Sequence, residues 1–245
     1  MVKIAINGFG RIGRAVLRAI YEQELSGVRV AAINDLAEPD MLLHLLKYDS
    51  AFGPFKKEVN LKNASFLVEG DKIKVLSERD PSNLPWEKLD IDVVLECTGV
   101  FTSRKDAGAH LGAGAGLVVI SANAKEDDTP HFVVGVNDSD FDPEKHKVSA
   151  MCSCTTNCAV PVVNELDKAF GLLKAHMLTI HAVTASQNLV DGPHKDFRRA
   201  RSALVNSVPT TTGSDRAVVR VLPSLKGRIT ASAVRVPVIC GSLLE

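Results

Sequence analysis

The sequence predicts an α/β protein of two domains, in which a doubly wound parallel sheet is followed by a mixed α+β unit. In the first half, short apolar segments of strand length alternate with amphipathic segments of helical period. A polar, turn-rich stretch at 138–147 then interrupts this alternation, and a cysteine-rich hexamer at 153–158 opens the remainder. We therefore place one domain at 1–152 and a second at 153–245.

Composition excludes several classes of protein. The 245 residues suffice for two modest domains, and 45% hydrophobic with 24% charged residues is typical of soluble globular chains. Lys plus Arg equals Asp plus Glu at 29 each, so neither nucleic acid nor an acidic membrane is an expected partner. No apolar run reaches membrane-spanning length, and the first residues resemble a strand rather than a signal peptide. Five cysteines, three of them within seven positions, favour free thiols and a cytoplasmic setting.

The first residues carry the most specific pattern. An apolar strand at 2–6 leads into the glycine turn Gly8 to Gly13, which is followed by a helix at 14–22. A second strand at 28–33 ends in Asn34 and Asp35, so the acid lies about twenty residues after the last glycine. A lone glycine triplet often marks a plain strand-to-helix turn. The strand, the helix and the acid together predict a Rossmann-type dinucleotide-binding unit.

Each residue of that pattern has a physical role. Gly8 permits a tight turn, Gly10 lets the backbone approach a pyrophosphate, and Gly13 allows the helix to pack closely on the strand. The pyrophosphate would sit at the helix N-terminus, where amide groups and the helix dipole favour negative charge. Asp35 would accept hydrogen bonds from the ribose hydroxyls and repel a 2′-phosphate. We therefore predict NAD rather than NADP as the cofactor.

The rest of the first domain is expected to complete the parallel sheet. The predicted helices lie at 41–46 and 104–111, and the predicted strands lie at 64–68, 72–76, 91–96 and 118–121. Thr98 with Gly99, and Ser121, each lie at the carboxyl end of one of these strands. Ligands of open α/β sheets bind at such carboxyl ends. Taken alone, Ser121 is equally consistent with an ordinary turn residue.

The hexamer Ser153 to Cys158 precedes an apolar helical segment that extends to about Gly171. Pro161 is expected to kink this helix or to mark a late start. A thiol at a helix N-terminus is favoured as thiolate, which makes Cys154 a candidate nucleophile. Most cysteines are inert buried or surface groups, and the hexamer alone leaves both interpretations open. The three cysteines lack a second pair of ligands at zinc spacing, so we expect no metal.

Downstream residues supply partners for this thiol. A strand at 177–182 carries His181, and the long basic loop 184–207 precedes a helix at 218–222 and a strand at 231–238. A lone strand-end histidine is usually structural, but Cys plus His is the pairing of an activated nucleophile. Guanidinium groups and the turn at Thr212 and Gly213 suit phosphate oxygens. With NAD, these groups indicate oxidation of an aldehyde through a thioester.

The chain as a whole resembles the glyceraldehyde-3-phosphate dehydrogenase family of the phosphorylating type. The motifs that carry the resemblance occur in the family's order and cover almost the whole chain. They are the stretches 6–14, 46–50, 153–158, 192–196, 198–201, 211–213 and 235–237.

The resemblance implies roles for individual residues. Cys154 matches the family's nucleophile, and His181 matches the base that pairs with it. Thr184 and Arg235 match residues that hold the phosphate of the substrate. The residues that match those around the attacking inorganic phosphate are Ser153, Thr155, Arg199, Thr212 and Gly213. Matches to NAD contacts are Arg11, Ile12, Asp35, Arg79 and Ser121. The implied reaction oxidises glyceraldehyde 3-phosphate to 1,3-bisphosphoglycerate in glycolysis.

The resemblance also implies a larger protein and a larger assembly. The family continues for roughly another quarter of its length beyond 245, so we expect the catalytic α+β domain to be incomplete, as in a fragment. The family's homotetramer places the loop 184–207 at a subunit interface. Met151 and Cys152 depart from the family's usual residues, and Cys152 adds a thiol close to Cys154. The alternatives are erythrose-4-phosphate dehydrogenase and an NAD-binding pseudoenzyme without catalysis.

Overall fold

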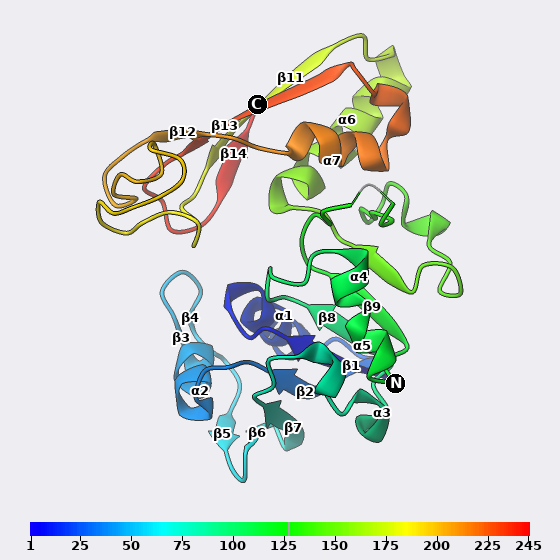
Figure 1. Ribbon diagram of the computed structural model, residues 1–245, viewed down its shortest axis with the longest axis vertical. Coiled ribbons are helices and arrows are strands. Elements are labelled where there is room, and N and C mark those ends of the chain that lie inside the picture. The colour runs from blue at the N-terminus through cyan, green and yellow to red at the C-terminus, as the bar shows by residue number, and fades with distance from the viewer. Residues whose placement is uncertain (127) are drawn as a thin grey trace. The chain divides into compact units, whose positions relative to one another are not determined.

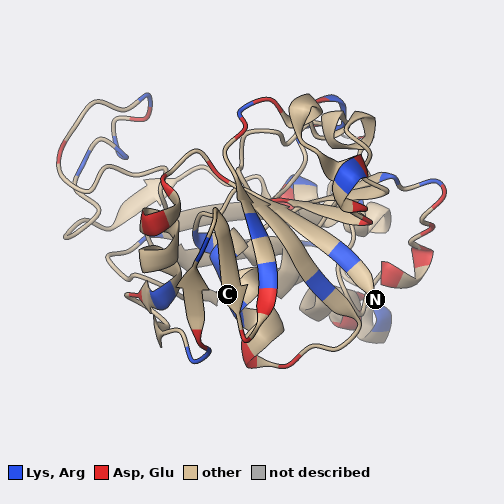
Figure 2. Ribbon diagram, turned by 90° about the horizontal axis from the view of Figure 1, so that it is seen from below, with Lys and Arg blue, Asp and Glu red and all other residues tan. Residues whose placement is uncertain are grey.

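The computed structural model describes residues 1–126 and 128–245 as two compact units (Figure 1). The first unit comprises Met1–His131 with Asp140–Met151, and the second comprises Phe132–Ser139 with Cys152–Glu245. Charged residues of both signs are interspersed along the chain (Figure 2), as the equal numbers of acids and bases suggest. Within the described residues, no helix has the length and apolar character needed to span a membrane.

The first unit is built on an eight-stranded sheet in the order β10-β9-β8-β1-β2-β7-β6-β5. These strands are β1 (Val2–Asn7), β2 (Val28–Asn34), β5 (Val59–Leu61), β6 (Ser65–Val68), β7 (Asp71–Leu76), β8 (Val93–Glu96), β9 (Leu117–Ile120) and β10 (Val148–Ala150). All pairings from β10 to β7 are parallel, whereas β6 pairs antiparallel with both β7 and β5. This arrangement confirms the predicted doubly wound parallel sheet.

Helices and short elements connect these strands. They are α1 (Arg11–Glu22), α2 (Pro39–Lys47), α3 (Trp86–Leu89), α4 (Arg104–Ala107), α5 (Ala109–Gly112), the ribbon of β3 (Tyr48–Asp49) and β4 (Gly53–Pro54), and the 3-10 turns η1 (Pro81–Asn83) and η2 (Asp138–Asp140). The predicted single helix at 104–111 is wrong, because Gly108 separates α4 from α5.

The strand order changes direction beside β1. The chain passes from β1 through α1 to β2 on one side, and later returns to place β8 on the other side. The carboxyl ends of β1 and β8 therefore meet, and this change of direction is where open α/β sheets bind ligands. Beneath it, Ile6, Leu17 and Ile33 are fully buried. Each such side chain contributes about 1.5–3 kcal/mol through burial.

Two glycines bring the backbone of this region together. Gly8 has φ +90°, and a Cβ there would lie 2.6 Å from the amide nitrogen of Thr98. A Cβ on Gly13 would lie 2.2 Å from the carbonyl oxygen of Gly8. Helix α1 therefore begins at Arg11, directly against β1, and the predicted start at Arg14 is three residues late.

The second unit consists of a four-stranded sheet covered by two helices. The sheet order is β12-β13-β11-β14, with strands β11 (Ala175–His181), β12 (Val208–Thr210), β13 (Ile229–Arg235) and β14 (Ser242–Leu244). Its helices are α6 (Cys154–Phe170), α7 (Ser214–Val221) and the 3-10 turn η3 (Pro223–Leu225). Val160 of α6 and Val218 of α7 are fully buried in one core with Met177 of β11.

Helix α6 differs from its prediction in one respect. It runs without interruption from Cys154 to Phe170 with Pro161 inside it, so the expected late start is wrong. Ser153 caps the helix and fixes its beginning at Cys154. The buried Val160 and Val163 on either side anchor the helix where Pro161 removes a backbone hydrogen bond. The predicted strand at 231–238 ends earlier, at Arg235.

We predict that Gly13→Ala lowers the free energy of unfolding of the first unit by about 1–3 kcal/mol, because the new methyl group would overlap the Gly8 carbonyl. Gly112→Ala is the matched control, since a Cβ there meets no atom within 4 Å. Urea denaturation followed by circular dichroism measures both. Equal midpoints for the two variants would contradict the packing argument.

Candidate active site

The beginning of α6 presents Cys154. The Ser153 hydroxyl accepts a hydrogen bond from the Thr156 amide at 3.2 Å, and the Asn157 side chain donates to the Ser153 carbonyl at 3.0 Å. These bonds cap the helix and place Cys154 as its first residue, with an exposed side chain. The 17-residue helix thus directs the positive end of its dipole at this thiol.

His181 lies at the end of β11 and faces the thiol. Its Nε2 is 3.2 Å from Cys154 Sγ, which is hydrogen-bonding distance for sulfur. Strand β11 pairs in parallel with β13, and this register places His181 opposite Arg235. A helix N-terminus and two strand ends therefore meet at one point in the second unit.

The other ring nitrogen determines the role of His181. Nδ1 lies 2.7 Å from the Ala182 carbonyl oxygen and also contacts Arg235 Nη1. It cannot both donate to the carbonyl and accept from the guanidinium, and we assign the bond to Ala182. Nε2 then carries a lone pair directed at Cys154 Sγ, as a base for the thiol requires.

The surroundings keep His181 neutral near pH 7. Burial lowers the pKa of His181, and the charge of Arg235 lowers it further, while the bond to Ala182 acts in the opposite sense. Burial also lowers the pKa of Arg235, with opposing help from the charge of Cys154. A guanidinium remains protonated throughout the ordinary pH range. The site thus combines a neutral base with a fixed cation.

Two other cysteines are poor nucleophiles by comparison. Burial raises the pKa of Cys97 to about 11 and that of Cys152 to about 12. Both thiols therefore stay protonated near neutral pH. Cys152 is buried in the core of the second unit, although it has a φ of +61°. No group of three metal-ligating His, Cys, Asp or Glu side chains occurs within the described residues.

Arg199 lies on the loop 184–207 and is fixed by hydroxyl groups. Its Nε donates to Thr210 Oγ1 at 2.6 Å, and its Nη2 donates to Thr211 Oγ1 at 3.2 Å. The charge of Arg199 also acts on Arg235, so both cations belong to the same region of the second unit. Such a pair of guanidinium groups is suited to phosphate.

The other residues predicted to bind phosphate lie on three further segments of the second unit. Thr155 is in the first turn of α6, and Thr212 and Gly213 precede α7, where the Thr212 and Ser214 hydroxyls lie 2.8 Å apart. The hydrogen bonds of Thr184 go to its own loop, to Ser186 and Gln187.

In the first unit, a cavity of about 340 Å³ opens at the carboxyl ends of β1, β2 and β8. Five predicted cofactor residues line it, namely Gly8, Gly10, Asp35, Arg79 and Thr98. Arg11, Ile12 and Gly13 form the first turn of α1 beside it, and Gly99 follows Thr98. The Ser121 amide donates at 3.0 Å to the carbonyl of Glu96, the residue before the lining Cys97. Sequence reasoning missed other lining residues, although they end or follow strands β2 and β8: Asn34, Leu36, Cys97, Val100 and Phe101.

Features of the cavity wall suit a dinucleotide. A Cβ on Gly10 would meet nothing within 4 Å, so the space beside this backbone is open to a ligand. No side chain caps α1, which leaves its first amides available to a pyrophosphate. The Asp35 carboxylate accepts from the Phe9 amide at 2.7 Å and from the Ala37 amide at 3.0 Å. These bonds fix Asp35 at the cavity wall.

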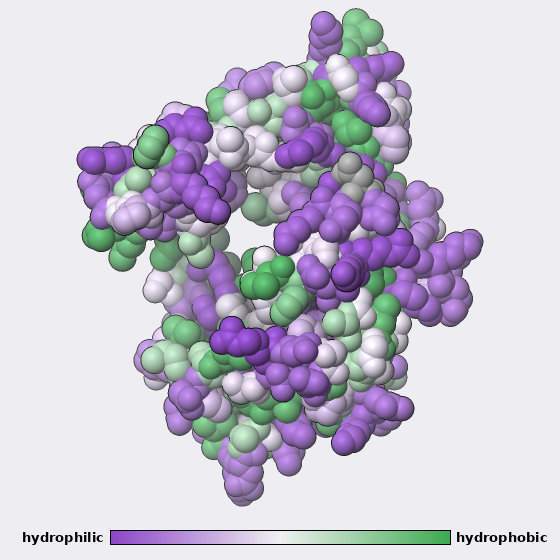
Figure 3. Space-filling model, in the orientation of Figure 1, coloured by the Kyte–Doolittle hydropathy of each residue, from purple (hydrophilic) through white to green (hydrophobic). Residues whose placement is uncertain are grey.

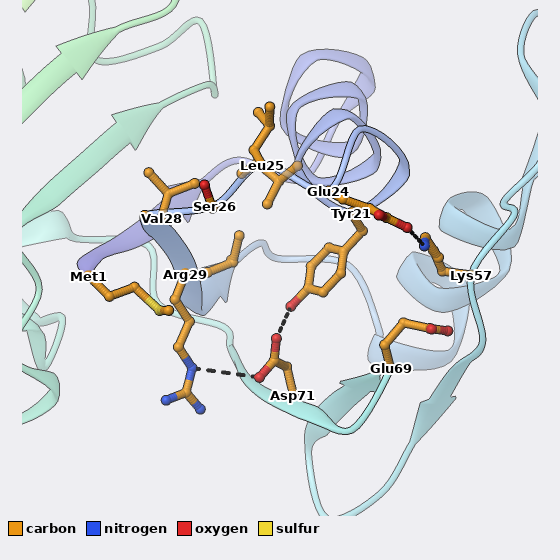
Figure 4. Close-up of a pocket in the computed structure, with 13 residues that line it drawn as sticks. Met1, Tyr21, Glu24, Leu25, Ser26, Val28, Arg29, Lys57, Glu69 and Asp71 are labelled. Atoms are coloured by element: carbon orange, nitrogen blue, oxygen red, sulfur yellow. Dashed lines mark hydrogen bonds and ion pairs between the residues drawn. The ribbon is translucent and has the colours of Figure 1, made fainter.

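A second cavity, of about 380 Å³, lies at the opposite ends of the strands, where β2 begins (Figure 4). It contains none of the predicted site residues, and Arg29 and Asp71, 4.0 Å apart, form one of its ion pairs. Tyr21 donates to Asp71 at 3.1 Å, and Lys57 lies 2.8 Å from Glu24. Burial and Asp71 together raise the pKa of Tyr21. We assign this cavity no function.

We predict that His181→Gln slows alkylation of Cys154 by iodoacetamide at pH 7 about tenfold, because an unassisted thiol is only a few per cent thiolate at that pH. His176→Gln is the matched control, since this exposed histidine on β11 bonds Thr230 and Ser232 instead. Peptide mass spectrometry measures alkylation at each cysteine. Equal rates for the two variants would show that His181 does not activate the thiol.

Two family models and several known proteins match this chain. Residues 2–104 match the family model "Glyceraldehyde 3-phosphate dehydrogenase, NAD binding domain", and residues 153–245 match the corresponding C-terminal domain. A glyceraldehyde-3-phosphate dehydrogenase of Clostridium pasteurianum is 51% identical over 247 residues, covering 100% of this chain and 73% of the relative. One from Streptomyces coelicolor is 48% identical over 244 residues, with 100% and 72% covered. The chain therefore belongs to the glyceraldehyde-3-phosphate dehydrogenase family.

Proposed function

We propose that this protein is an NAD-dependent, phosphorylating glyceraldehyde-3-phosphate dehydrogenase that works through a thioester on Cys154. The observation that carries the proposal is the 3.2 Å contact between Cys154 Sγ and His181 Nε2 at the beginning of α6. The relatives bear this enzyme's name, and the matched models cover both parts of the chain.

His181 moves the protons of the first half-reaction. Its neutral Nε2 accepts the thiol proton as Cys154 Sγ bonds the aldehyde carbon, and returns it to the aldehyde oxygen to give a thiohemiacetal. NAD, when bound, supplies the hydride acceptor. Nε2 then takes the hydroxyl proton as the hydride leaves the same carbon, and a thioester on Cys154 remains.

Inorganic phosphate releases the acyl group in the second half-reaction. We assign Ser153, Thr155, Arg199, Thr212 and Gly213 to the attacking phosphate. An oxygen of this phosphate bonds the acyl carbon, the C–S bond breaks, and Cys154 leaves as thiolate. The product is the acyl phosphate 1,3-bisphosphoglycerate. Thr184 and Arg235 hold the phosphate that the substrate already carries, and guanidinium binding favours both anions.

The residues of the first unit would hold NAD. The first turn of α1, with Arg11, Ile12 and Gly13, takes the pyrophosphate. Asp35 takes the adenosine ribose, and the other wall residues Gly8, Gly10, Arg79, Thr98, Gly99 and Ser121 complete the contacts. The open space beside Gly10 and the uncapped helix support this assignment.

We place the loop 184–207 at a subunit interface of a homotetramer. The loop forms no helix or strand, and it exposes large apolar side chains (Figure 3). These side chains are Leu189, Val190, Phe197, Leu204 and Val205. Burial of such groups against another subunit would stabilise an assembly. The free thiols favour the reducing cytoplasm as the enzyme's compartment.

We predict that the wild-type chain produces more than one NADH per active site only when glyceraldehyde 3-phosphate, NAD and phosphate are all present. Cys154→Ser should reduce turnover by at least about 10³-fold, because the hydroxyl is a far weaker nucleophile than the thiol. Cys158→Ser is the control, since its thiol is one turn further along the helix. Absorbance at 340 nm gives the rates. Faster turnover of erythrose 4-phosphate would favour the tetrose enzyme, and NAD binding without turnover would identify a pseudoenzyme.

We predict that Asp35→Asn reduces the preference for NAD over NADP about tenfold. The substitution removes the charge that repels a 2′-phosphate and weakens the bonds to the ribose hydroxyls. Calorimetric titration with each nucleotide measures the ratio of the two Kd values. Asp40→Asn controls for net charge, because Asp40 is exposed and does not line the cavity. An unchanged ratio in Asp35→Asn would contradict the assignment of Asp35.

A further inference from the structure

Beneath the predicted NAD cavity lies a hydrogen-bonded network of buried polar side chains to which the proposed function gives no role. Asn7 ends β1, Asn34 ends β2 and Glu96 ends β8, and these three side chains are 1%, 4% and 1% exposed. His110 of α5 and Trp86 of α3 are fully buried beside them. Buried polar groups are costly unless each finds a partner, so their hydrogen bonds can be followed one by one.

Glu96 lies at the centre and accepts hydrogen bonds on both oxygens. Oε1 accepts from the Thr98 amide at 2.8 Å and from the Thr98 hydroxyl. Oε2 accepts from Asn7 Nδ2 at 2.6 Å and lies 3.2 Å from His110 Nε2. Both oxygens of Glu96 thus act as acceptors, as the oxygens of a carboxylate do.

Trp86 determines the tautomer of His110. An indole N–H can only donate, and Trp86 Nε1 lies 2.9 Å from His110 Nδ1. Nδ1 is therefore the acceptor, and the proton of the neutral ring is on Nε2, where it is donated to Glu96. Asn7 Nδ2 and His110 Nε2 lie 3.3 Å apart as two donors to one oxygen. The buried charge of Glu96 is thus stabilised entirely by neutral donors.

The hydrogen-bonded network continues to two further walls of the cavity. Asn7 Oδ1 accepts from Asn34 Nδ2 at 2.7 Å. Asn34 in turn exchanges two bonds with the backbone of Glu78, whose amide donates to Oδ1 at 2.8 Å and whose carbonyl accepts from Nδ2 at 2.9 Å. Glu78 precedes Arg79, and Asn34 precedes Asp35. The hydrogen bonds from Glu96 therefore reach the segments that carry Gly8, Asp35, Arg79 and Thr98.

We propose that Glu96 is a positioning residue, whose buried carboxylate holds four walls of the NAD cavity in one arrangement. This inference rests on the proposed function, because it assumes that the cavity binds NAD. The negative charge of the Glu96 side chain matters for this arrangement as well as its shape. A carboxamide at this position would place its own N–H groups against Thr98 or against Asn7 and His110, leaving a buried donor without an acceptor.

The test compares NAD binding by the wild type and by Glu96→Gln. We expect Glu96→Gln to raise the Kd of NAD at least about fivefold, because cavity segments shift to relieve the facing donors. We expect kcat at saturating NAD to stay within about twofold, since Cys154 and His181 are untouched. A global loss of stability would not raise the Kd of NAD while leaving kcat at saturating NAD unchanged.

A charge exchange provides the rescue. In the double variant N7D/E96Q, the carboxylate introduced at position 7 would accept from Asn34, from the new carboxamide and from His110, while the carboxamide oxygen would accept from Thr98. The donors of Asn34, His110 and Thr98 then each face an acceptor again, with the charge moved one residue across, and the second carboxamide N–H alone gains no acceptor in this network. We expect the Kd of NAD to return to within about twofold of the wild-type value. Val94→Ala, on the same strand, is the control that lowers the thermal midpoint without changing this Kd.

The outcomes separate the two proposals. Wild-type protein that does not bind NAD would overturn both the proposed function and this inference. Binding by the wild type, with an unchanged Kd in Glu96→Gln, would overturn only the role of Glu96. If Glu96→Gln does not fold, a folded N7D/E96Q that binds NAD supports the proposal, and an unfolded one overturns it. A folded N7D/E96Q that binds as weakly as Glu96→Gln also overturns it.

Discussion

The contact between Cys154 Sγ and His181 Nε2, at 3.2 Å, is the interaction on which the chemistry of this protein depends. Three features of the second unit produce it. Ser153 caps α6 and so fixes the position of the thiol, while the parallel pairing of β11 with β13 sets His181 beside Arg235. The Ala182 carbonyl then selects the ring tautomer whose lone pair faces sulfur. Thiol activation thus follows from ordinary backbone structure, with burial, aided by the charge of Arg235, lowering the pKa of the base.

In the first unit, backbone contacts likewise position the nucleotide cavity. Close packing of Gly8 against Thr98, and of Gly13 against Gly8, brings the start of α1 to the carboxyl ends of β1 and β8. Beneath these turns, the buried carboxylate of Glu96 gathers neutral donors from separate segments of the chain. Glycine contacts and a buried charge therefore fix the backbone amides and Asp35 at the cavity before any ligand arrives.

The sequence predicted the parts of this structure that arise from local patterns. Alternating apolar segments indicated the parallel sheet, and the glycine spacing with Asp35 indicated where a dinucleotide would bind. What depends on distant contacts was not predictable. The uninterrupted helix through Pro161 and the pairing of His110 with Trp86 depend on contacts between separate segments. Cys154 was selected among its neighbours by resemblance, and burial of Cys152 gives a physical reason for that choice.

The most direct test of the account is to trap the acyl group on the enzyme. The protein would be mixed with glyceraldehyde 3-phosphate and one equivalent of NAD without phosphate, quenched in acid and mapped by peptide mass spectrometry. We expect a glyceroyl 3-phosphate thioester on Cys154, formed together with NADH and lost when phosphate is added before the quench. NADH formation with acylation at another cysteine, or with no acylated cysteine, would contradict it.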